Sequence, residues 1–124
     1  MALDFGLART GVALGNSLLR QAQPLEIIHA ATNNDRWEKL GVLVALWKPD
    51  AFVVGVPRHG DGSPTDLTAR CERFGRQAAA RYRRPVFYVD ERFSSVVVED
   101  AEDFIDDRAA AVILQQFFNE HEAL

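Results

Sequence analysis

The sequence predicts an α/β fold: a mixed five-stranded sheet with helices on both faces. Two observations predict it. Three short apolar runs separated by turn residues open the chain, which is typical of antiparallel strands joined by short connections. Beyond them, segments with helical periodicity alternate with apolar runs, the pattern of crossover connections between parallel strands.

The first three strands are expected at residues 2–5, 11–14 and 25–30, because each is a short apolar run closed by turn residues. The connection formed by residues 6–10 has the length of a hairpin loop. The three strands should therefore form an antiparallel meander.

A helix is expected over residues 34–47, where Trp37, Leu40, Val44 and Trp47 recur at helical spacing. This spacing places both tryptophans on the apolar stripe, so both are expected in the core. Asn33 or Asn34 can cap the start of the helix, and Pro49 prevents its continuation.

The second half of the chain predicts two more strands and two more helices. Residues 51–56 form a continuous apolar run that suits a strand buried on both faces, and residues 86–89 should form another buried strand. Residues 58–65 contain two glycines and a proline and should be a loop. One helix is expected over residues 66–82, with an apolar stripe of Leu67, Cys71, Phe74, Ala78 and Tyr82. The last helix should start at Asp106 or Asp107 and bury Ala109, Ala110, Ile113, Leu114 and Phe117. Between these elements, Ser94 or Ser95 could cap a further helix, but three consecutive valines disfavour it.

Composition favours one domain over residues 1–124, because 48% of the residues are hydrophobic and the length suits a single core. A lone cysteine, Cys71, cannot form an intramolecular disulfide, which indicates a reducing, cytoplasmic protein. No leader-like segment and no apolar stretch of membrane-spanning length are present, so a membrane location is not expected.

The net charge of −4 argues against a uniformly basic surface, yet the charges are unevenly placed. Six arginines fall within residues 70–84, and six acids fall within residues 99–107. The arginines of the expected helix could follow a nucleic-acid backbone, or could form only a solvated face with a Glu72–Arg76 pair.

Three carboxylates stand out as candidate metal ligands. Asp4 interrupts an apolar strand, where an uncompensated charge would cost several kcal/mol. Glu91 follows the end of the 86–89 strand, and Asp106 begins the last helix on its buried side. If these residues converge, their hard oxygen donors select Mg²⁺ or Mn²⁺. Two such ions would suit in-line displacement at a phosphodiester.

Each acid also has a purely structural interpretation. Asp4 could pair with Arg9 or Arg92, and Glu91 could pair with Arg92 at the surface. Asp106 could be an ordinary helix N-cap. The order of a strand Asp, a strand-end Glu and a helix-start Asp favours the metal site.

Several short motifs together resemble the YqgF family, also called RuvX. They are Leu3-Asp4-Phe5-Gly6, Arg9-Thr10-Gly11-Val12-Ala13, Gln23-Pro24-Leu25, Trp47-Lys48-Pro49-Asp50, Val54-Gly55-Val56-Pro57, Asp61-Gly62-Ser63, Asp90-Glu91-Arg92-Phe93-Ser94-Ser95 and Ile105-Asp106. These motifs cover nearly the whole chain in the family's order.

The resemblance implies a ribonuclease-H-like fold, a bacterial cytoplasmic protein, and trimming of the 5′ end of pre-16S rRNA. It places the metal-binding acids at Asp4, Glu91 and Asp106. One feature departs from the family: only fourteen residues separate Glu91 from Asp106, and they are acidic where the family has a longer connection with a basic loop. Either this member lacks the loop or residues are missing from the sequence. Asp107 is the alternative third ligand.

Arg9, Arg58 and Arg92 are the candidate substrate-binding residues, because each lies close in sequence to a candidate acid or to the loop after a buried strand. The expected partner is nucleic acid: structured RNA, pre-16S rRNA or branched DNA. The protein could act as a monomer or as a homodimer.

Three rival functions stay open. A Holliday-junction resolvase would act on four-way DNA. A non-catalytic nucleic-acid-binding module would need no acids, and all three are present. The Asp4-Phe5-Gly6 segment also resembles the phosphate loop of actin-like ATPases, which need a second domain that 124 residues cannot supply.

Overall fold

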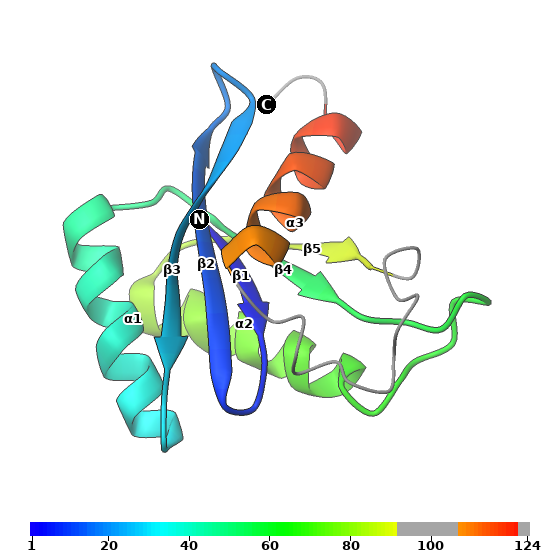
Figure 1. The fold of residues 1–124 in the computed structure, drawn as a ribbon, viewed down its shortest axis with the longest axis horizontal. Helices are drawn as coiled ribbons and strands as arrows, with labels where there is room; N and C mark the ends of the chain where they lie inside the picture. Colours follow the sequence, from blue (N-terminus) through cyan, green and yellow to red (C-terminus); the bar gives the residue numbers. More distant parts are fainter. Residues whose placement is uncertain (92–106, 122–124) are drawn as a thin grey trace.

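The computed structural model describes residues 1–91 and 107–121. Within them a five-stranded sheet has the order β3-β2-β1-β4-β5 (Figure 1). The strands are β1 (Ala2–Phe5), β2 (Arg9–Asn16), β3 (Gln21–His29), β4 (Phe52–Val56) and β5 (Val86–Asp90). Strands β1, β2 and β3 pair antiparallel, whereas β4 pairs parallel with both β1 and β5. The predicted mixed sheet is confirmed.

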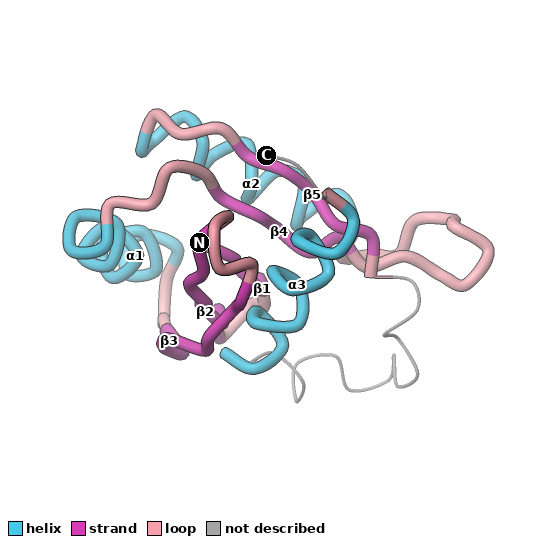
Figure 2. The backbone as a smooth tube through the Cα atoms, turned by 90° about the horizontal axis from the view of Figure 1, so that it is seen from above, coloured by secondary structure: helices cyan, strands magenta, loops and turns pink. Residues whose placement is uncertain are grey.

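Three helices cover the two faces of this sheet. Helices α1 (Asn33–Trp47) and α2 (Thr68–Tyr82) pack on one face, and α3 (Asp107–Glu120) packs on the other (Figure 2). No helix within residues 1–91 and 107–121 is both long and apolar enough to cross a membrane.

The face under α1 and α2 is built from large side chains. Leu3, Val12 and Phe52 of the sheet pack against Trp37, Leu40 and Leu43 of α1 and Phe74 of α2. The Trp37 ring stacks on Phe74, with 5.0 Å between ring centroids, and Phe5 lies 4.7 Å from Phe74. Burial of this aromatic and aliphatic cluster stabilises the packing of α1 and α2 on the sheet.

The face under α3 carries small side chains. Ala2, Ala13 and Val53 of the sheet contact Ala110, Ile113, Leu114, Phe117 and Phe118 of α3. A Cβ atom at Gly15 would lie 3.0 Å from Leu114 and Phe118. The small residues therefore let α3 approach the sheet closely, and the expected buried stripe of this helix is confirmed at Ala110, Ile113, Leu114 and Phe117.

The tip of the β2–β3 hairpin holds the C-terminal end of α3. Arg20, at a positive φ of 54°, donates to the carbonyl oxygens of His121, at 2.8 Å, and Phe118. In return, Gln115 of α3 donates to the Arg20 carbonyl at 3.1 Å. A cation at the C-terminus of a helix satisfies carbonyls that lack intrahelical partners.

Three sequence-based predictions were wrong in detail. Trp47 is 49% exposed and not in the core, because none of the elements formed by residues 1–91 and 107–121 covers its side chain. Thr32, not Asn33 or Asn34, caps α1 by accepting from the Asp35 N–H at 3.1 Å. Strand β5 is an edge strand, so Phe87 and Tyr88 are about 40% exposed where a buried strand was expected. The uncertain element at residues 94–105 lies outside the described residues.

Candidate active site

Asp4 is a buried carboxylate on the face of the sheet that α3 covers. Side chains alternate along β1, so Asp4 shares the face of Ala2, which packs against α3, and not that of Leu3. The residue is only 5% exposed. This placement agrees with the prediction that Asp4 is an acid inside an apolar strand.

Gly55 is the neighbour of Asp4 on the next strand. The parallel register pairs Ala2 with Val53 and Leu3 with Val54, and one step further along this register lie Asp4 and Gly55. Adjacent strands are about 4.8 Å apart, and paired residues present their side chains on the same face. Asp4 therefore has a residue without a side chain beside it.

The carboxylate of Glu91 occupies the space above Gly55. A Cβ atom built on Gly55 would lie 2.4 Å from Glu91 Oε2 and 2.6 Å from Ile113 Cδ1 of α3. The backbone N–H of Glu91 donates to the carbonyl of Val56 at 3.0 Å, which fixes the chain just after β5. Glu91 thus reaches from the end of β5 over β4, and its carboxylate lies on the α3 face, as does that of Asp4.

The surroundings of Glu91 disfavour its ionised form. Burial, followed by repulsion from the Asp90 carboxylate, raises the pKa of Glu91 from 4.5 to about 7. A nearby cation would reverse this effect because it favours the ionised form. A raised carboxyl pKa beside a second buried acid is typical of sites that bind cations or catalyse reactions.

Cys71 of α2 lies within electrostatic reach of both acids. Burial, followed by the charges of Glu91, Asp4 and Glu72, raises the pKa of this thiol to about 12. Cys71 is buried, as expected, and its high pKa makes it a poor nucleophile.

Arg36 of α1 holds the turn that follows Asp4. Its guanidinium donates to the carbonyls of Gly6, at 3.0 Å, and Leu7, and to Asn33 Oδ1 at 2.7 Å. The same group lies 4.9 Å from the centroid of the Phe5 ring. Arg36 is only 3% exposed, so a buried cation fixes the β1–β2 connection directly beside Asp4.

Arg9, a predicted substrate contact, lies on the same face as Asp4. Asp4 pairs with Gly11 across β1 and β2, and Arg9 is two residues from Gly11 on the same strand. Residues two apart on a strand share a face. The half-buried Arg9 is therefore placed at the end of β1 nearest the candidate acids.

Arg58, another predicted substrate contact, has partners within the chain. It lies in the loop after β4, where its guanidinium reaches Glu72 Oε2 of α2 at 3.8 Å and the Gly62 carbonyl at 3.4 Å. The ion pair of Glu72 is thus with Arg58 and not with Arg76, the partner that helical spacing suggests. The structure leaves Arg58 near the edge of the sheet but does not bring it to Asp4.

The third acid of the prediction, Asp106, and the third arginine, Arg92, lie outside the described residues. Asp107, the alternative ligand, begins α3 and is half-buried. Among residues 1–91 and 107–121, no three His, Cys, Asp or Glu side chains form a group that could hold a metal. The described part of the chain thus places two of the predicted acids, Asp4 and Glu91, on the same face of the sheet.

Gly55 and Arg36, two neighbours of the candidate acids, were not predicted as part of the site. Gly55 interrupts the apolar run of residues 51–56, and an isolated glycine in a strand often marks a close approach by another group, so the sequence carries a signal for it. Arg36 has no comparable signal, because a basic residue near the start of a helix is normally solvent-exposed.

Comparisons with known proteins identify the relatives of this chain. The family model named "RuvX: Holliday junction resolvase" matches residues 1–120. A protein of Paraburkholderia phytofirmans is 45% identical over 96% of this chain and 86% of its own length. A Burkholderia vietnamiensis protein is 45% identical over 97% of this chain and 88% of its own length, and a Burkholderia mallei protein is 46% identical over 96% and 86%. All three carry the name "Putative pre-16S rRNA nuclease".

Proposed function

Because this chain belongs to the RuvX family, with its ribonuclease-H-like fold, we propose that it is a metal-dependent nuclease that processes the 5′ end of pre-16S rRNA. The observation that carries the proposal is that Asp4 lies beside Gly55 and the Glu91 carboxylate lies over Gly55, on the same face of the sheet. Both acids lie on the face under α3, and burial together with the Asp90 charge raises the pKa of Glu91 to about 7. A bound cation would favour the ionised form of both acids.

Asp4, Glu91 and Asp106 would hold the metal, with Asp107 as the alternative to Asp106. Carboxylate oxygens are the donors that Mg²⁺ and Mn²⁺ prefer, and the thiol of Cys71 stays protonated near neutral pH. When bound, such ions lower the pKa of water and stabilise the leaving oxygen of a phosphodiester.

The other residues of the site orient the substrate and the acids. Arg9 lies on the face of Asp4 and is placed to meet a phosphate, and Arg92 adjoins Glu91 in the sequence. To bind a phosphate, Arg58 would have to leave its ion pair with Glu72. That pair is partly exposed and 3.8 Å long, so breaking it would cost little free energy. Arg36 fixes the turn after β1, so the Asp4 backbone does not have to be ordered when substrate binds.

A second function, cleavage of four-way DNA, is favoured by the description of the matching family model. The two functions differ in substrate and not in the acids they use. A resolvase must also make two symmetric cuts and therefore work as a dimer, whereas trimming one RNA end needs a single site. The proposal is for the RNA nuclease, acting in the cytoplasm as a monomer or homodimer.

The test compares wild type with Asp4→Asn and Glu91→Gln on a precursor 16S RNA 5′ end and on a four-way DNA junction. With Mg²⁺ or Mn²⁺, each substitution should slow cleavage by about 10²–10⁴-fold, because it removes one metal-binding carboxylate. Calorimetric titration with Mn²⁺ should show weaker binding for both variants.

Glu26→Gln is the matched control, because it removes one negative charge from an exposed position on β3. Its rate and Mn²⁺ affinity should equal those of wild type. Equal cleavage by wild type and Asp4→Asn would contradict the proposal and indicate a contaminating nuclease. Faster cutting of the junction than of the RNA would favour the resolvase.

A further inference from the structure

We propose that three arginines of α2, Arg70, Arg73 and Arg81, bind the phosphate backbone of the substrate at a distance from the cleaved bond. We call them the α2 arginine stripe. The inference rests on the proposed nuclease function and names the surface that holds the rest of the nucleic acid.

The α2 helix concentrates positive charge on a protein whose net charge is −4. It carries four arginines and a single acid, Glu72, which pairs with Arg58 of the loop after β4. Arg70, Arg73 and Arg81 are all exposed. Within the described residues, the ion pairs involve other cations, Lys39 and Arg58. The stripe therefore offers unneutralised positive charge to solvent, and such a surface attracts polyanions.

The stripe has a length that suits a nucleic-acid strand. Arg70 and Arg81 are eleven residues apart, which is three helical turns, so they share one side of α2 about 16 Å apart along the axis. Arg73 lies between them, one turn from Arg70. Over about 16 Å, one strand of a duplex presents on the order of five phosphates. Several contacts to consecutive phosphates are therefore geometrically available.

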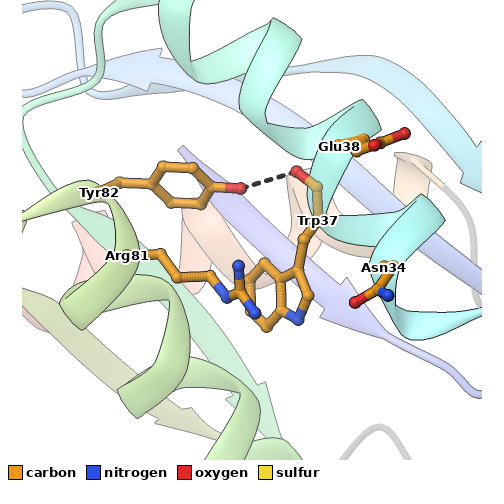
Figure 3. A pocket seen from close by; sticks show the side chains of 5 residues that line it. All are labelled: Asn34, Trp37, Glu38, Arg81 and Tyr82. Atoms are coloured by element: carbon orange, nitrogen blue, oxygen red, sulfur yellow. Dashed lines mark hydrogen bonds between the residues drawn. The ribbon is translucent and has the colours of Figure 1, made fainter.

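Arg81 is already held in an orientation suited to binding. Its guanidinium lies over the indole of Trp37, 4.6 Å from the ring centroid, beside a hollow lined by Asn34, Trp37, Glu38, Arg81 and Tyr82 (Figure 3). The Tyr82 hydroxyl donates to the Trp37 carbonyl at 2.9 Å and ties α2 to α1. Stacking restricts the long Arg81 side chain, so less conformational entropy is lost when it binds a phosphate.

The stripe starts near the candidate active site and leads away from it. Helix α2 begins directly after the loop that follows β4, and the Thr68 hydroxyl donates to the Pro57 carbonyl at the end of that strand. Figure 1 shows α2 running from this loop behind the sheet toward α1. A strand cleaved beside Asp4 and Glu91 could therefore cross the edge of the sheet and continue along α2.

The test measures how RNA binding depends on salt. A fluorescein-labelled RNA hairpin is titrated with full-length protein carrying Asp4→Asn, with and without the added pair Arg70→Gln and Arg73→Gln, across a potassium chloride series. Each lost phosphate contact should reduce the slope of log Kd against log salt by about one, so the pair should reduce it by about two and weaken binding at low salt by about 10–100-fold. Arg81→Lys keeps the charge but loses the flat stack, so it should leave the slope unchanged and cost a few-fold in affinity.

The matched control is the pair Lys39→Gln and Lys48→Gln, which removes the same charge from α1 and its end. This lysine pair should leave the slope of log Kd against log salt close to that of the Asp4→Asn protein alone. A slope unaffected by the arginine pair, or reduced equally by the lysine pair, would overturn the inference. Equally effective competition by polyglutamate would also overturn it, in favour of an acidic protein partner.

A kinetic experiment separates this inference from the proposed function. In protein with intact acids, the arginine pair should raise KM for a long RNA and leave kcat unchanged, while a short RNA that cannot reach α2 is cleaved as by wild type. If Asp4→Asn fails to abolish cleavage but the arginine pair still lowers the salt slope, the active-site assignment fails and the stripe stands. If Asp4→Asn abolishes cleavage and the slope does not change, only the stripe fails.

Discussion

The two faces of the sheet differ in the size of the side chains they carry. Under α1 and α2, Leu3, Val12 and Phe52 fill the space with large apolar groups. Under α3, Ala2 and Ala13 carry small side chains and Gly55 carries none, and both candidate acids lie on that face. One face therefore stabilises the fold, while the other leaves room for polar groups that an apolar core would exclude.

The same comparison holds for charge. The α3 face encloses two carboxylates, whereas the outside of α2, beyond the opposite face, carries the arginine stripe. A protein with net negative charge can still bind a polyanion when its positive charge is gathered on one surface.

The largest effect, on the rate of cleavage, is expected from adding a side chain at Gly55 on the α3 face. In Gly55→Ala the new Cβ would lie 2.4 Å from Glu91 Oε2, so the flexible Glu91 side chain must move. Cleavage should slow by about 10²-fold, because displacement of a catalytic group by about 1 Å can cost that much. The far-ultraviolet circular dichroism spectrum should match wild type.

Gly41→Ala is the control for this change. A Cβ at Gly41 of α1 would lie 3.6 Å from Tyr82 Oη, an ordinary contact distance. Alanine inside a helix should raise stability by about 0.5–1 kcal/mol and leave cleavage unchanged. Full activity of Gly55→Ala would show that the position of Glu91 does not depend on the missing side chain at Gly55.

A large loss of stability is expected when Arg36 is replaced on the other face. Arg36→Met keeps much of the volume but leaves the carbonyls of Gly6 and Leu7 without this donor. The free energy of unfolding should fall by about 2–4 kcal/mol, as measured by urea denaturation. Arg76→Met, at an exposed position of α2, should change the free energy of unfolding by less than about 0.5 kcal/mol. Similar values for the two variants would mean that Arg36 does not fix the turn.

An intermediate effect, dependent on pH, is expected from Glu91→Gln. In the metal-free protein the pKa of Glu91 is about 7 against an ordinary 4.5, so between these values the folded state keeps a proton that the unfolded state has lost. Wild-type stability should therefore fall as the pH rises from about 4.5 to about 7. At pH 8 in chelator, Glu91→Gln should be more stable than wild type by about 1–3 kcal/mol. The gap should close near pH 4.5, and parallel curves over this range would contradict the raised pKa.

The smallest effect is expected at Thr10. Its buried hydroxyl has no hydrogen-bond partner among the described residues, and alternation along β2 places it on the face of Val12, away from the acids. Thr10→Val should therefore keep activity and raise stability by at most about 1 kcal/mol. Thr68→Val, which removes a hydroxyl bonded to Pro57, should instead lower it by about 1–2 kcal/mol. Thermal denaturation distinguishes the two variants. A loss of stability in Thr10→Val equal to that in Thr68→Val would show that the Thr10 hydroxyl does form a stabilising hydrogen bond.

Much of the fold was predictable because local signals agreed with the final structure. The expected 2–5 strand coincides with β1, and the expected 51–56 strand differs from β4 by one residue. Strands β2 and β3 are longer than expected, since polar residues such as Gln21 and Gln23 are tolerated on an edge strand. Pro24 fits there too, because an edge strand can lack a ladder hydrogen bond.

The misplaced residues share one cause. Periodicity tells which side of a helix Trp37 and Trp47 occupy, but not which turn a neighbouring element covers. Likewise, the apolar run of Phe87 and Tyr88 does not reveal that β5 lies at the edge of the sheet. Asp4 and Glu91 were identifiable as candidates, but their meeting depends on the register between β1 and β4, which is a property of tertiary structure.

The contact of Arg20 with the end of α3 has a consequence for the order of assembly. A ribosome makes all five strands before it makes α3. Arg20 of the β2–β3 hairpin can therefore bind the end of α3 only after about 90 more residues have been synthesised. Until that helix emerges, Ala2, Ala13 and Val53 face water and Glu91 lacks the wall formed by Ile113. The strands of the sheet are therefore synthesised before the candidate active site is complete.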